Sequence, residues 1–528
     1  MSALATVAAT AALPAAFEPA QINYWAVLPM IVLFGAAMVG VLIEAFAPRT
    51  SRVPLQLGLS VVAVLAAFAV LVLRSVDHQG VTLEGSVVID GPALFLQGAL
   101  LLMGLLGILT MAERFGGDGP DAFTPMGAAV PGSGLEAAVA RQGWATSEVF
   151  PLTLFSLGGM LLFTAAGDLL TMFVALEVLS LPLYLLTGLA RRRRLLSQEA
   201  ALKYFLLGSF ASAFFLFGAA LLYGYAGSLD LPAIAKAISE APVALEGLLL
   251  PGIFFVLVGL LFKVGAAPFH SWTPDAYQGA PTPVTGFMAA CTKLAAFGAI
   301  LRVCYVAFEG DRWGWRWAVI AIAALTMLVG SVLSVTQTDI KRLLAYSSIA
   351  HAGFILVGVL AFDRTGIAGV MFYLVAYGFS TIAAFAIVSL VRRSGSEASH
   401  ISQWAGLGKR HPIVAACFSL LLIAFAGIPL TSGFTAKVAA FAPAVAHGGT
   451  AGVVLVVLGV LCSAVTAFVY IRIIVLMYFT EGNDDVVAIQ PSALTTIAIT
   501  AGVAITLVLG IFPAPLLDIA EQSSQFLR

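Results

Sequence analysis

Four ionisable side chains lie deep inside stretches that are otherwise apolar enough to cross a membrane: Glu177, Lys263, Lys293 and Lys437. A charge at the centre of a membrane helix costs roughly 2.5–3.5 kcal/mol on insertion scales, so four cost on the order of 10 kcal/mol. This cost is comparable with the net stability of a whole protein. Packing alone does not call for such residues, and we expect them to face the protein interior and to mark an ion path.

Glu177 and Lys263 carry opposite charges and are a candidate pair that shares a proton. A closed pair favours both charged forms, whereas an open pair leaves the lysine desolvated and able to release its proton near neutral pH. Arginine, which stays protonated, lacks this property. The alternative for the deep charges is a static ion pair, or side chains that snorkel to the membrane surface.

The stretch LLFKVGAAPFHSWTPDAYQGAPTP, which runs from Leu260 to Pro283, places Lys263 beside a helix-breaking sequence. Pro268 and Pro274 do not fit the interior of a regular helix. A broken helix in lipid is tolerated only where protein or a water-filled cavity satisfies the freed backbone groups. We therefore predict hydrated space near Lys263, followed by a polar half-helix that lines a water path to the cytoplasm.

Weaker candidates are side chains that could relay protons between these sites. Histidine titrates near neutrality, so His270 and His351 are possible relays, although packing is an equally open role for His351. Lys203 and Tyr204 begin a predicted span, where snorkelling is the favoured role for Lys203. Charges near span ends are expected to set topology or to cap a helix; they are Lys341, Arg342 and Asp168.

The composition indicates which elements must position these residues. Hydrophobic residues make up 61% of the 528-residue chain and charged residues only 10%, with a mean hydropathy of +1.03. Soluble domains carry roughly a quarter charged residues. The chain is therefore predicted to be an all-α polytopic membrane protein of about fourteen spans. The predicted spans are 24–46, 54–74, 91–112, 149–166, 168–190, 199–226, 247–279 (broken), 281–307, 316–336, 344–361, 366–391, 412–447 (broken), 451–479 and 493–513.

The distribution of Lys and Arg sets the predicted orientation. Loops after odd-numbered spans carry most of the basic residues, so they should face the cytoplasm, with both termini outside a bacterial plasma membrane. The run Arg191–Arg194 is expected to serve mainly as a topology and lipid anchor. Segment 113–148, rich in Gly, Pro and Ala, is expected to be flexible. The net charge of −1 gives no indication of a nucleic-acid partner.

A faint internal repeat divides the chain. YFLLGSFASAFF begins at Tyr204 and YLVAYGFSTIAAF at Tyr373, and each precedes a lysine beside helix-breaking residues. The two units are offset by five spans, so the copies should cross the membrane in opposite directions, as in inverted-repeat transporters. The predicted units are 1–148, a three-helix region with its loop; 149–307, the first five-helix repeat; 316–480, the second repeat; and 490–528, the last helix.

No redox or energy-transducing group can be assigned to the chain itself. Its four cysteines, Cys291, Cys304, Cys417 and Cys462, are far apart and fit neither a metal site nor an iron–sulfur cluster. The sequence has no phosphate-binding loop and no dinucleotide-binding glycine motif. The driving energy is therefore expected to come from a partner or from an ion gradient.

Five motifs resemble, in the same order, those of the antiporter-like subunits of proton-pumping NADH–quinone oxidoreductase, respiratory complex I. They are LEVLSLPLYLL, EAALKYFLLGSFASAFFLFG, FKVGAAPFHSWTPDAYQGAPTPVTGFMAACTKLAAFGAILR, DIKRLLAYSSIAHAGFILVG and GIPLTSGFTAKVAAF. The resemblance implies a proton path in which Glu177 pairs with Lys263, Lys293 is central and Lys437 is the outlet. It also implies that quinone reduction in partner subunits drives the protons, and that those partners hold the flavin, iron–sulfur clusters and quinone.

Among three homologous subunit types, the chain resembles type N. Lys437 stands where type M has a glutamate, and the extra spans and lateral helix of type L are absent. The resemblance implies contacts with the M, K, J and A subunits and with lipids, although the first third of the chain matches weakly. Two alternatives stay open: a subunit of a multi-subunit cation/proton antiporter, which shares the fold and motifs, and a scaffold subunit that does not pump.

Overall fold

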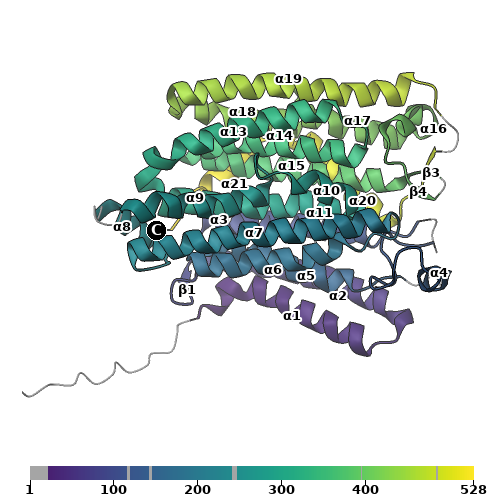
Figure 1. Cartoon of the computed structure of the whole chain (residues 1–528), viewed down its shortest axis with the longest axis horizontal. Coiled ribbons are helices and arrows are strands. Elements are labelled where there is room, and N and C mark those ends of the chain that lie inside the picture. Colours follow the sequence, from purple (N-terminus) through teal and green to yellow (C-terminus); the bar gives the residue numbers. More distant parts are fainter. Residues whose placement is uncertain are drawn as a thin grey trace, which may run out of the picture.

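The computed structural model describes residues 22–115, 119–141, 145–240, 246–393, 395–482 and 486–527. Its long helices lie side by side along one axis, so loops and short strands gather at the two ends of a helical bundle (Figure 1). Within the described residues, twelve helices are long and apolar enough to cross a membrane, and two shorter apolar helices accompany them. The predicted class, a helical polytopic membrane protein, is confirmed.

Every predicted span coincides with a helix or a broken helix. The helices are α1 (Tyr24–Phe46), α2 (Arg49–Leu73), α3 (Gly91–Met111), α5 (Val149–Ala165), α6 (Leu169–Thr187), α7 (Arg194–Ala226), α9 (Glu246–Val264) with α10 (Trp272–Gly279), α11 (Thr282–Phe287) with α12 (Lys293–Arg302), α13 (Arg312–Val335), α14 (Ile340–Val359), α15 (Arg364–Leu390), α17 (Pro412–Ala426) with α18 (Ser432–His447), α19 (Gly449–Phe479) and α20 (Ala493–Ile511). Several of these helices start after an aspartate whose side chain accepts a hydrogen bond from a backbone N–H group of the first turn. Asp90 caps α3, Asp168 caps α6 as predicted, and Asp339 caps α14.

Two of the membrane helices are interrupted, as predicted. Between α9 and α10 the chain turns at Gly265 with a φ of +76°, and between α17 and α18 it turns at Gly427 with a φ of +79°. Glycine adopts such angles without a steric penalty. Lys263 precedes its break, whereas Lys437 follows its own. The sequence has the same order, because Lys263 precedes Pro268 whereas Lys437 follows segment 427–433.

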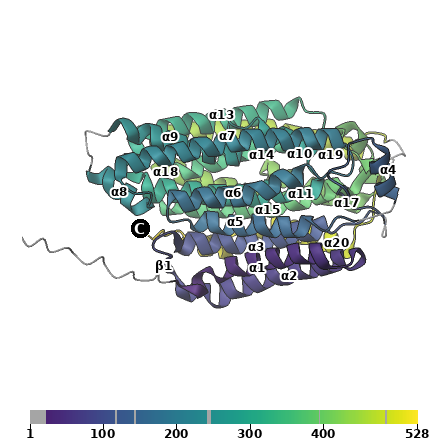
Figure 2. The ribbon, with the colours of Figure 1, turned by 60° about the horizontal axis from the view of Figure 1, so that its bottom comes forward.

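The core of the bundle is formed by the helix that carries Lys293 and by its neighbours. The run Thr282–Ala307 and α15 are buried along their apolar length, and α14 is nearly so. α11 passes into α12 through a π-helical segment, Met288–Thr292. By contrast α1, α2, α7, α13, α19 and α20 expose apolar side chains on the outside of the bundle, as lipid-facing helices do. Figure 2 shows α1 and α2 along one such edge.

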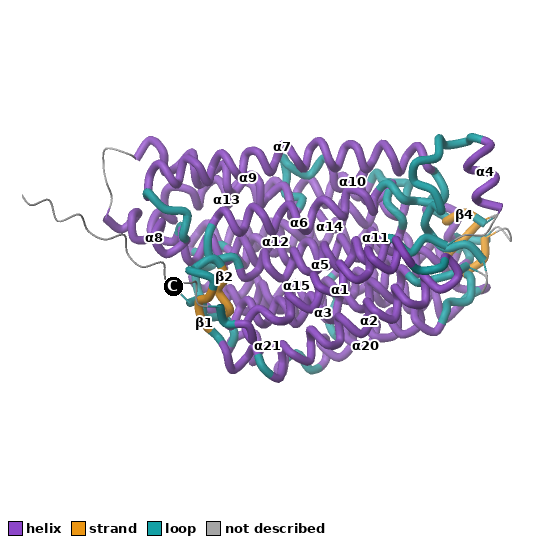
Figure 3. The backbone as a smooth tube through the Cα atoms, turned by 90° about the horizontal axis from the view of Figure 1, so that it is seen from below, coloured by secondary structure: helices purple, strands orange, loops and turns teal. Residues whose placement is uncertain are grey.

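Short elements that the sequence did not predict cover both ends of the bundle (Figure 3). One end carries α8 (Leu231–Glu240), α21 (Ala514–Gln522) and an antiparallel hairpin of β1 (Gly80–Thr82) and β2 (Val87–Ile89). The other end carries α4 (Gly134–Arg141), α16 (Leu407–Arg410) and a sheet in the order β4-β3-β5, formed by β3 (Val391–Arg393), β4 (Ser396–Glu397) and β5 (Val486–Ala488). We call them the β1–β2 end and the β3–β5 end.

Segment 113–148, predicted to be flexible, is fastened to the bundle in its described part. The backbone N–H of Thr124 donates to the carbonyl of Leu189 at 2.8 Å. The Asp121 carboxylate pairs with the Arg191 guanidinium at 2.7 Å. These contacts hold the segment against the loop between α6 and α7, which its Gly- and Ala-rich composition did not indicate.

Candidate functional site

Lys263 is buried in the last turn of α9, directly before the break. Its Nζ donates hydrogen bonds to Ser180 Oγ of α6 at 2.7 Å and to Tyr204 OH of α7 at 3.1 Å. The Tyr204 ring centroid lies 5.3 Å from the ammonium group. Hydroxyl groups both donate and accept hydrogen bonds, so this site can hold the lysine with or without its extra proton.

Glu177 lies on α6 one turn before Ser180, but the structure shows no ion pair between its carboxylate and Lys263. Its Oε1 atom is buried and has no hydrogen-bond partner among the described residues. The two residues of the candidate pair are thus near neighbours in an open arrangement, with Ser180 bound to the lysine instead. A buried oxygen without a partner is costly, and this atom is positioned to accept a proton, a water or the lysine.

Lys293 is buried at the start of α12, directly after the π-helical segment. Its Nζ donates to the backbone carbonyl of Ser348 on α14 and, at 2.7 Å, to the Ser348 hydroxyl. The Tyr377 ring of α15 lies 5.5 Å from the ammonium group. π-Helical segments are frequent at functional sites. The partners of this lysine among the described residues are uncharged.

His351 lies between the surroundings of this central lysine and those of Lys437. It is on α14 one turn after Ser348, and its ring is 5.9 Å from that of Phe425, whose carbonyl binds Lys437. Its Nδ1 is 2.8 Å from Tyr373 OH, and its Nε2 is buried without a partner in the described part of the chain. A histidine with one ring nitrogen bonded and the other open can pass on a proton.

Lys437 is buried in α18, after the second break. Its Nζ donates to the carbonyls of Phe425 at 3.1 Å and Ala426 at 2.8 Å. It also donates to Ser463 Oγ of α19 at 2.6 Å. The two carbonyls belong to the last residues of α17, and the C-terminal end of a helix carries a partial negative charge. The ammonium group therefore satisfies the open carbonyls of the broken helix.

The other candidates around the first break lie in a chain of ion pairs and in the break itself. The Lys203 side chain is 45% exposed and pairs with Glu199 at 2.6 Å and Asp275 at 3.0 Å. Asp275, on the polar half-helix α10, also pairs with Arg342 at 2.6 Å. His270 lies in the break, and its buried Nδ1 has no partner among the described residues.

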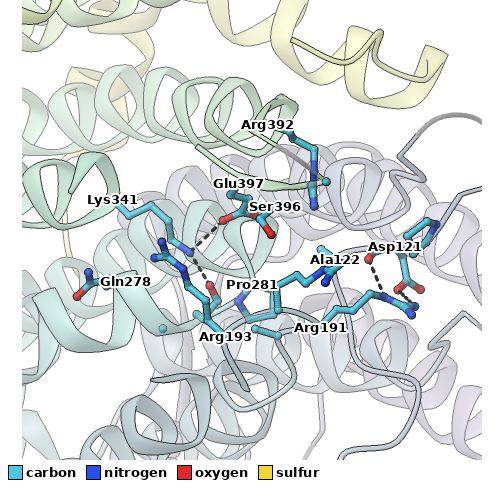
Figure 4. A pocket seen from close by; sticks show the side chains of 16 residues that line it. Asp121, Ala122, Arg191, Arg193, Gln278, Pro281, Lys341, Arg392, Ser396 and Glu397 are labelled. Atoms are coloured by element: carbon cyan, nitrogen blue, oxygen red, sulfur yellow. Dashed lines mark hydrogen bonds and ion pairs between the residues drawn. The ribbon is translucent and has the colours of Figure 1, made fainter. Parts of the chain in front are cut away.

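Basic side chains from both halves of the chain line a pocket at the β3–β5 end (Figure 4). They are Arg191, Arg192, Arg193, Lys341 and Arg392. Lys341 is buried; its Nζ donates to the carbonyl of Ala280 at 2.6 Å and lies 3.8 Å from the Glu397 carboxylate. We expected these charges, Lys341 and the run Arg191–Arg194, to set the topology. In the structure they also connect the loops at this end of the bundle.

One buried ion pair, between Arg302 and Asp90, was not predicted from the sequence. Arg302, at the end of α12, makes two hydrogen bonds of 3.0 and 2.8 Å with Asp90, and both side chains are 1% exposed. The signal for Asp90 is the Gly-Pro that follows it, because an aspartate before a proline is typical of a helix start. Arg302 stands in an apolar run, as the four deep charges do, and could have been included with them.

No group of three or more His, Cys, Asp or Glu side chains within the described ranges could hold a metal ion. All four cysteines are free thiols; Cys291, Cys304 and Cys462 are buried and Cys417 is half-buried. The chemistry that the three lysine sites offer is the binding and release of protons.

Comparison with known sequences gives a family assignment. The sequence profile described as NADH:quinone oxidoreductase/Mrp antiporter, transmembrane, matches residues 166–463, which include all four deep ionisable residues. The chain is 56% identical to the NADH-quinone oxidoreductase subunit N of Salinispora arenicola, over 96% of this chain and 99% of that one. It is 54% identical to the NADH-quinone oxidoreductase subunit N 3 of Streptomyces griseus, over 97% of this chain and 96% of that one.

Solved structures share the fold. A chain of respiratory complex I from Thermus thermophilus with bound aureothin is 32% identical and superposes with a TM-score of 0.75, over 93% of this chain and 99% of that one. A chain of the Mrp complex from Dietzia superposes with a TM-score of 0.78, over 94% of this chain and 96% of that one. Its identity of 22% supports the fold alone.

Proposed function

The chain belongs to the NADH:quinone oxidoreductase/Mrp antiporter family, as a member of the subunit N type of NADH-quinone oxidoreductase, and we propose that Glu177, Lys263, Lys293 and Lys437 form its proton path. It is a membrane-spanning subunit of an oxidoreductase complex. Proton translocation is its proposed part in that enzyme. We propose that its neighbours in the membrane are the M, K, J and A subunits. We also propose that the flavin, iron–sulfur clusters and quinone are held by partner subunits and not by this chain.

The observation that carries this proposal is that the three lysines of the path, Lys263, Lys293 and Lys437, have only neutral hydrogen-bond partners among the described residues. Hydroxyl and carbonyl oxygens bind an ammonium group, but they do not supply the full negative charge that would keep it protonated. A lysine in such a site can lose its proton when its surroundings change, whereas an arginine cannot. Each of the three also lies at a break or at a π-helical segment.

The proposed path runs from the first half of the chain to the second. When Glu177 approaches Lys263, the pair favours the protonated lysine; when the two separate, the proton can move toward Lys293. His351 connects the surroundings of Lys293 with those of Lys437. Quinone reduction in neighbouring subunits drives the opening and closing of the pair.

We also propose that the path uses two inverted repeats, at 149–307 and 316–480, with 1–148 and 490–528 flanking them. Tyr204 and Tyr373, the first residues of the repeated motif, support this division because each hydroxyl contacts a proposed carrier. The basic β3–β5 end faces the cytoplasm, and the β1–β2 end faces outward across the plasma membrane.

The antiporter alternative is supported by the fold shared with the Mrp complex chain. Identities of 54% and 56% to subunit N proteins favour the redox-driven enzyme. The scaffold alternative does not explain the buried charges, because a subunit that does not pump has no need for side chains that are costly to insert into a membrane.

The proposal is tested by Lys263→Ala in the assembled enzyme, with NADH–quinone activity and NADH-driven proton pumping measured in the same membranes. Loss of both with normal assembly supports a coupled path through Lys263. The matched control is Lys236→Ala, because the Lys236 side chain is 75% exposed on α8, where it pairs with Glu240 at 3.8 Å. Wild-type values for both activities in Lys263→Ala would overturn the proposal.

A further inference from the structure

The buried ion pair at the β1–β2 end of the central helix has no part in the proposed path. Arg302 Nη1 and Nη2 lie 3.0 and 2.8 Å from the two carboxylate oxygens of Asp90. Arg302 Nε donates to the carbonyl of Thr164 at 3.1 Å, and Asp90 also accepts from the backbone N–H of Leu527 at 3.3 Å. The start of α3 and the ends of α5 and α12 therefore meet at one guanidinium group.

Segment 523–527 lies over this ion pair. The Phe526 ring centroid is 5.2 Å from Arg302 Cζ. Ser523 packs so closely on Gly91 that a Cβ there would lie 2.7 Å from the Ser523 carbonyl oxygen. A cavity of about 560 Å³ adjoins the segment; its lining includes Tyr305, Asp363, Arg364 and Phe526. Both charged side chains are 1% exposed, so the ion pair lies inside the protein beneath this segment.

The ion pair lies on the same helix as Lys293, nine residues away (302 minus 293), which is about 14 Å along the axis at 1.5 Å per residue. α3 runs alongside in the opposite direction, and Gln97, seven residues after Asp90 (97 minus 90), reaches almost the depth of Lys293. Gln97 Oε1 and Thr292 Oγ1 are buried without hydrogen-bond partners among the described residues. Such atoms are typical sites for internal water.

We propose that Arg302 is an insulating residue, a fixed positive charge that prevents protons from passing directly from Lys293 to the β1–β2 side. On α3 and α12 it is the next cationic side chain from Lys293 toward that end. A guanidinium group stays protonated in proteins, so it cannot accept and pass on a proton. Positive charges exclude protons from other pores in the same way. Asp90 holds the guanidinium group in place. A proton that leaves Lys293 then moves across the bundle toward His351.

This inference rests on the proposed function, and it differs from a purely structural role in what it predicts. If the pair only stabilised the fold, two uncharged residues of similar size would alter stability but not proton conductance. Removing a single partner would leave an unpaired buried charge, which is strongly destabilising. The test therefore changes both residues together.

The experiment uses the whole enzyme in proteoliposomes, with Arg302→Gln and Asp90→Asn combined. The decay of an imposed pH gradient is followed without NADH, and NADH–quinone activity is measured separately. We expect decay to become about tenfold faster, which corresponds to about 1.4 kcal/mol removed from the barrier, with NADH–quinone activity retained. Unchanged decay in the assembled variant would overturn the inference.

The matched control is Arg191→Gln with Asp121→Asn, which neutralises the 2.7 Å ion pair at the opposite end and should leave decay unchanged. If the Arg302→Gln, Asp90→Asn variant does not assemble, Arg302→Lys, which keeps a cation opposite Asp90 but can release its proton, decides the question. Faster decay in that variant supports the inference, and wild-type decay contradicts it.

Adding Lys293→Ala to the Arg302→Gln, Asp90→Asn variant identifies the route. We expect slow decay to return, because the leak should pass through Lys293. Persistent fast decay would show a route that avoids this lysine and would overturn the inference. Normal pumping in Lys293→Ala alone would instead contradict the proposed function, so the two failures can be told apart.

Discussion

The partners of each buried lysine decide what it can do. Ser180 and Tyr204 around Lys263, and Ser348 beside Lys293, offer hydroxyl groups that can turn from acceptor to donor when the lysine loses its proton. A carboxylate in the same place would bind the ammonium form alone. At this scale, the site is built for two protonation states rather than for a permanent ion pair.

Lys263→Arg tests this reading of the first site. Arginine keeps the positive charge and can still bind Ser180 and Tyr204, but it does not release its proton. We expect pumping and NADH–quinone activity to fall at least about tenfold, equivalent to about 1.4 kcal/mol, while the enzyme assembles normally. Near-normal pumping in this variant would show that Lys263 acts only through its charge.

The deep charges could be predicted from the sequence, but their partners could not. A lysine or glutamate stands out in an apolar run because few residues there are charged. Ser180 and Ser348 do not stand out, since a serine in a membrane helix acquires a role only from the helix that packs against it. Asp90 and Arg302 are 212 positions apart, and only tertiary packing brings them together.

At the scale of elements, the surroundings of the three lysines are formed by irregular helices: two broken helices and one π-helical segment. The two breaks could be predicted because proline and glycine interrupt helices in known ways. The π-helical segment before Lys293, MAACT, has no such marker. Nor does the sequence show that Lys437 binds the last carbonyls of α17, because that contact depends on how α18 folds back after Gly427.

Gly427→Ala tests the second break. Gly427 has a φ of +79°, and a Cβ there would lie 2.8 Å from both Nζ and Cδ of Lys437. We expect the free energy of unfolding to fall by about 1–3 kcal/mol because of backbone strain. We also expect the added Cβ to displace the Lys437 side chain and to reduce proton pumping. Thermal stability of the purified enzyme and its pumping are the measurements.

Gly85→Ala is the control for this prediction. Gly85 has a φ of +95°, but an added Cβ would have no neighbour within 4 Å. It should therefore show the strain without the loss of pumping. Equal pumping in the two variants would contradict the idea that Gly427 makes room for Lys437.

At the scale of the whole molecule, the two ends differ in charge. The β3–β5 end gathers Lys341, Arg392 and the run Arg191–Arg193 around one pocket. The first and last described residues lie near the opposite end, where Asn23 binds Thr82 and Leu527 binds Asp90. The helices themselves were predictable from hydropathy, whereas the hairpin, the small sheet and α8 are too short to leave a pattern.

The proposed orientation predicts how the two ends react with a membrane-impermeant thiol reagent. Single cysteines would be placed at Glu240, exposed at the β1–β2 end, and at Lys409, exposed at the β3–β5 end, in a chain without its own cysteines. In intact cells we expect Glu240→Cys to be labelled and Lys409→Cys to be labelled only after the membrane is opened. The reverse pattern would mean that the positive-inside argument fails here.

Proton passage through the buried lysines is tested most directly at Lys293. The measurement is NADH-driven proton pumping and NADH–quinone activity in membranes that contain the assembled enzyme with Lys293→Ala. We expect both to fall together, because the lysine that joins the two halves of the path is gone. Wild-type pumping and activity in the assembled variant would contradict it.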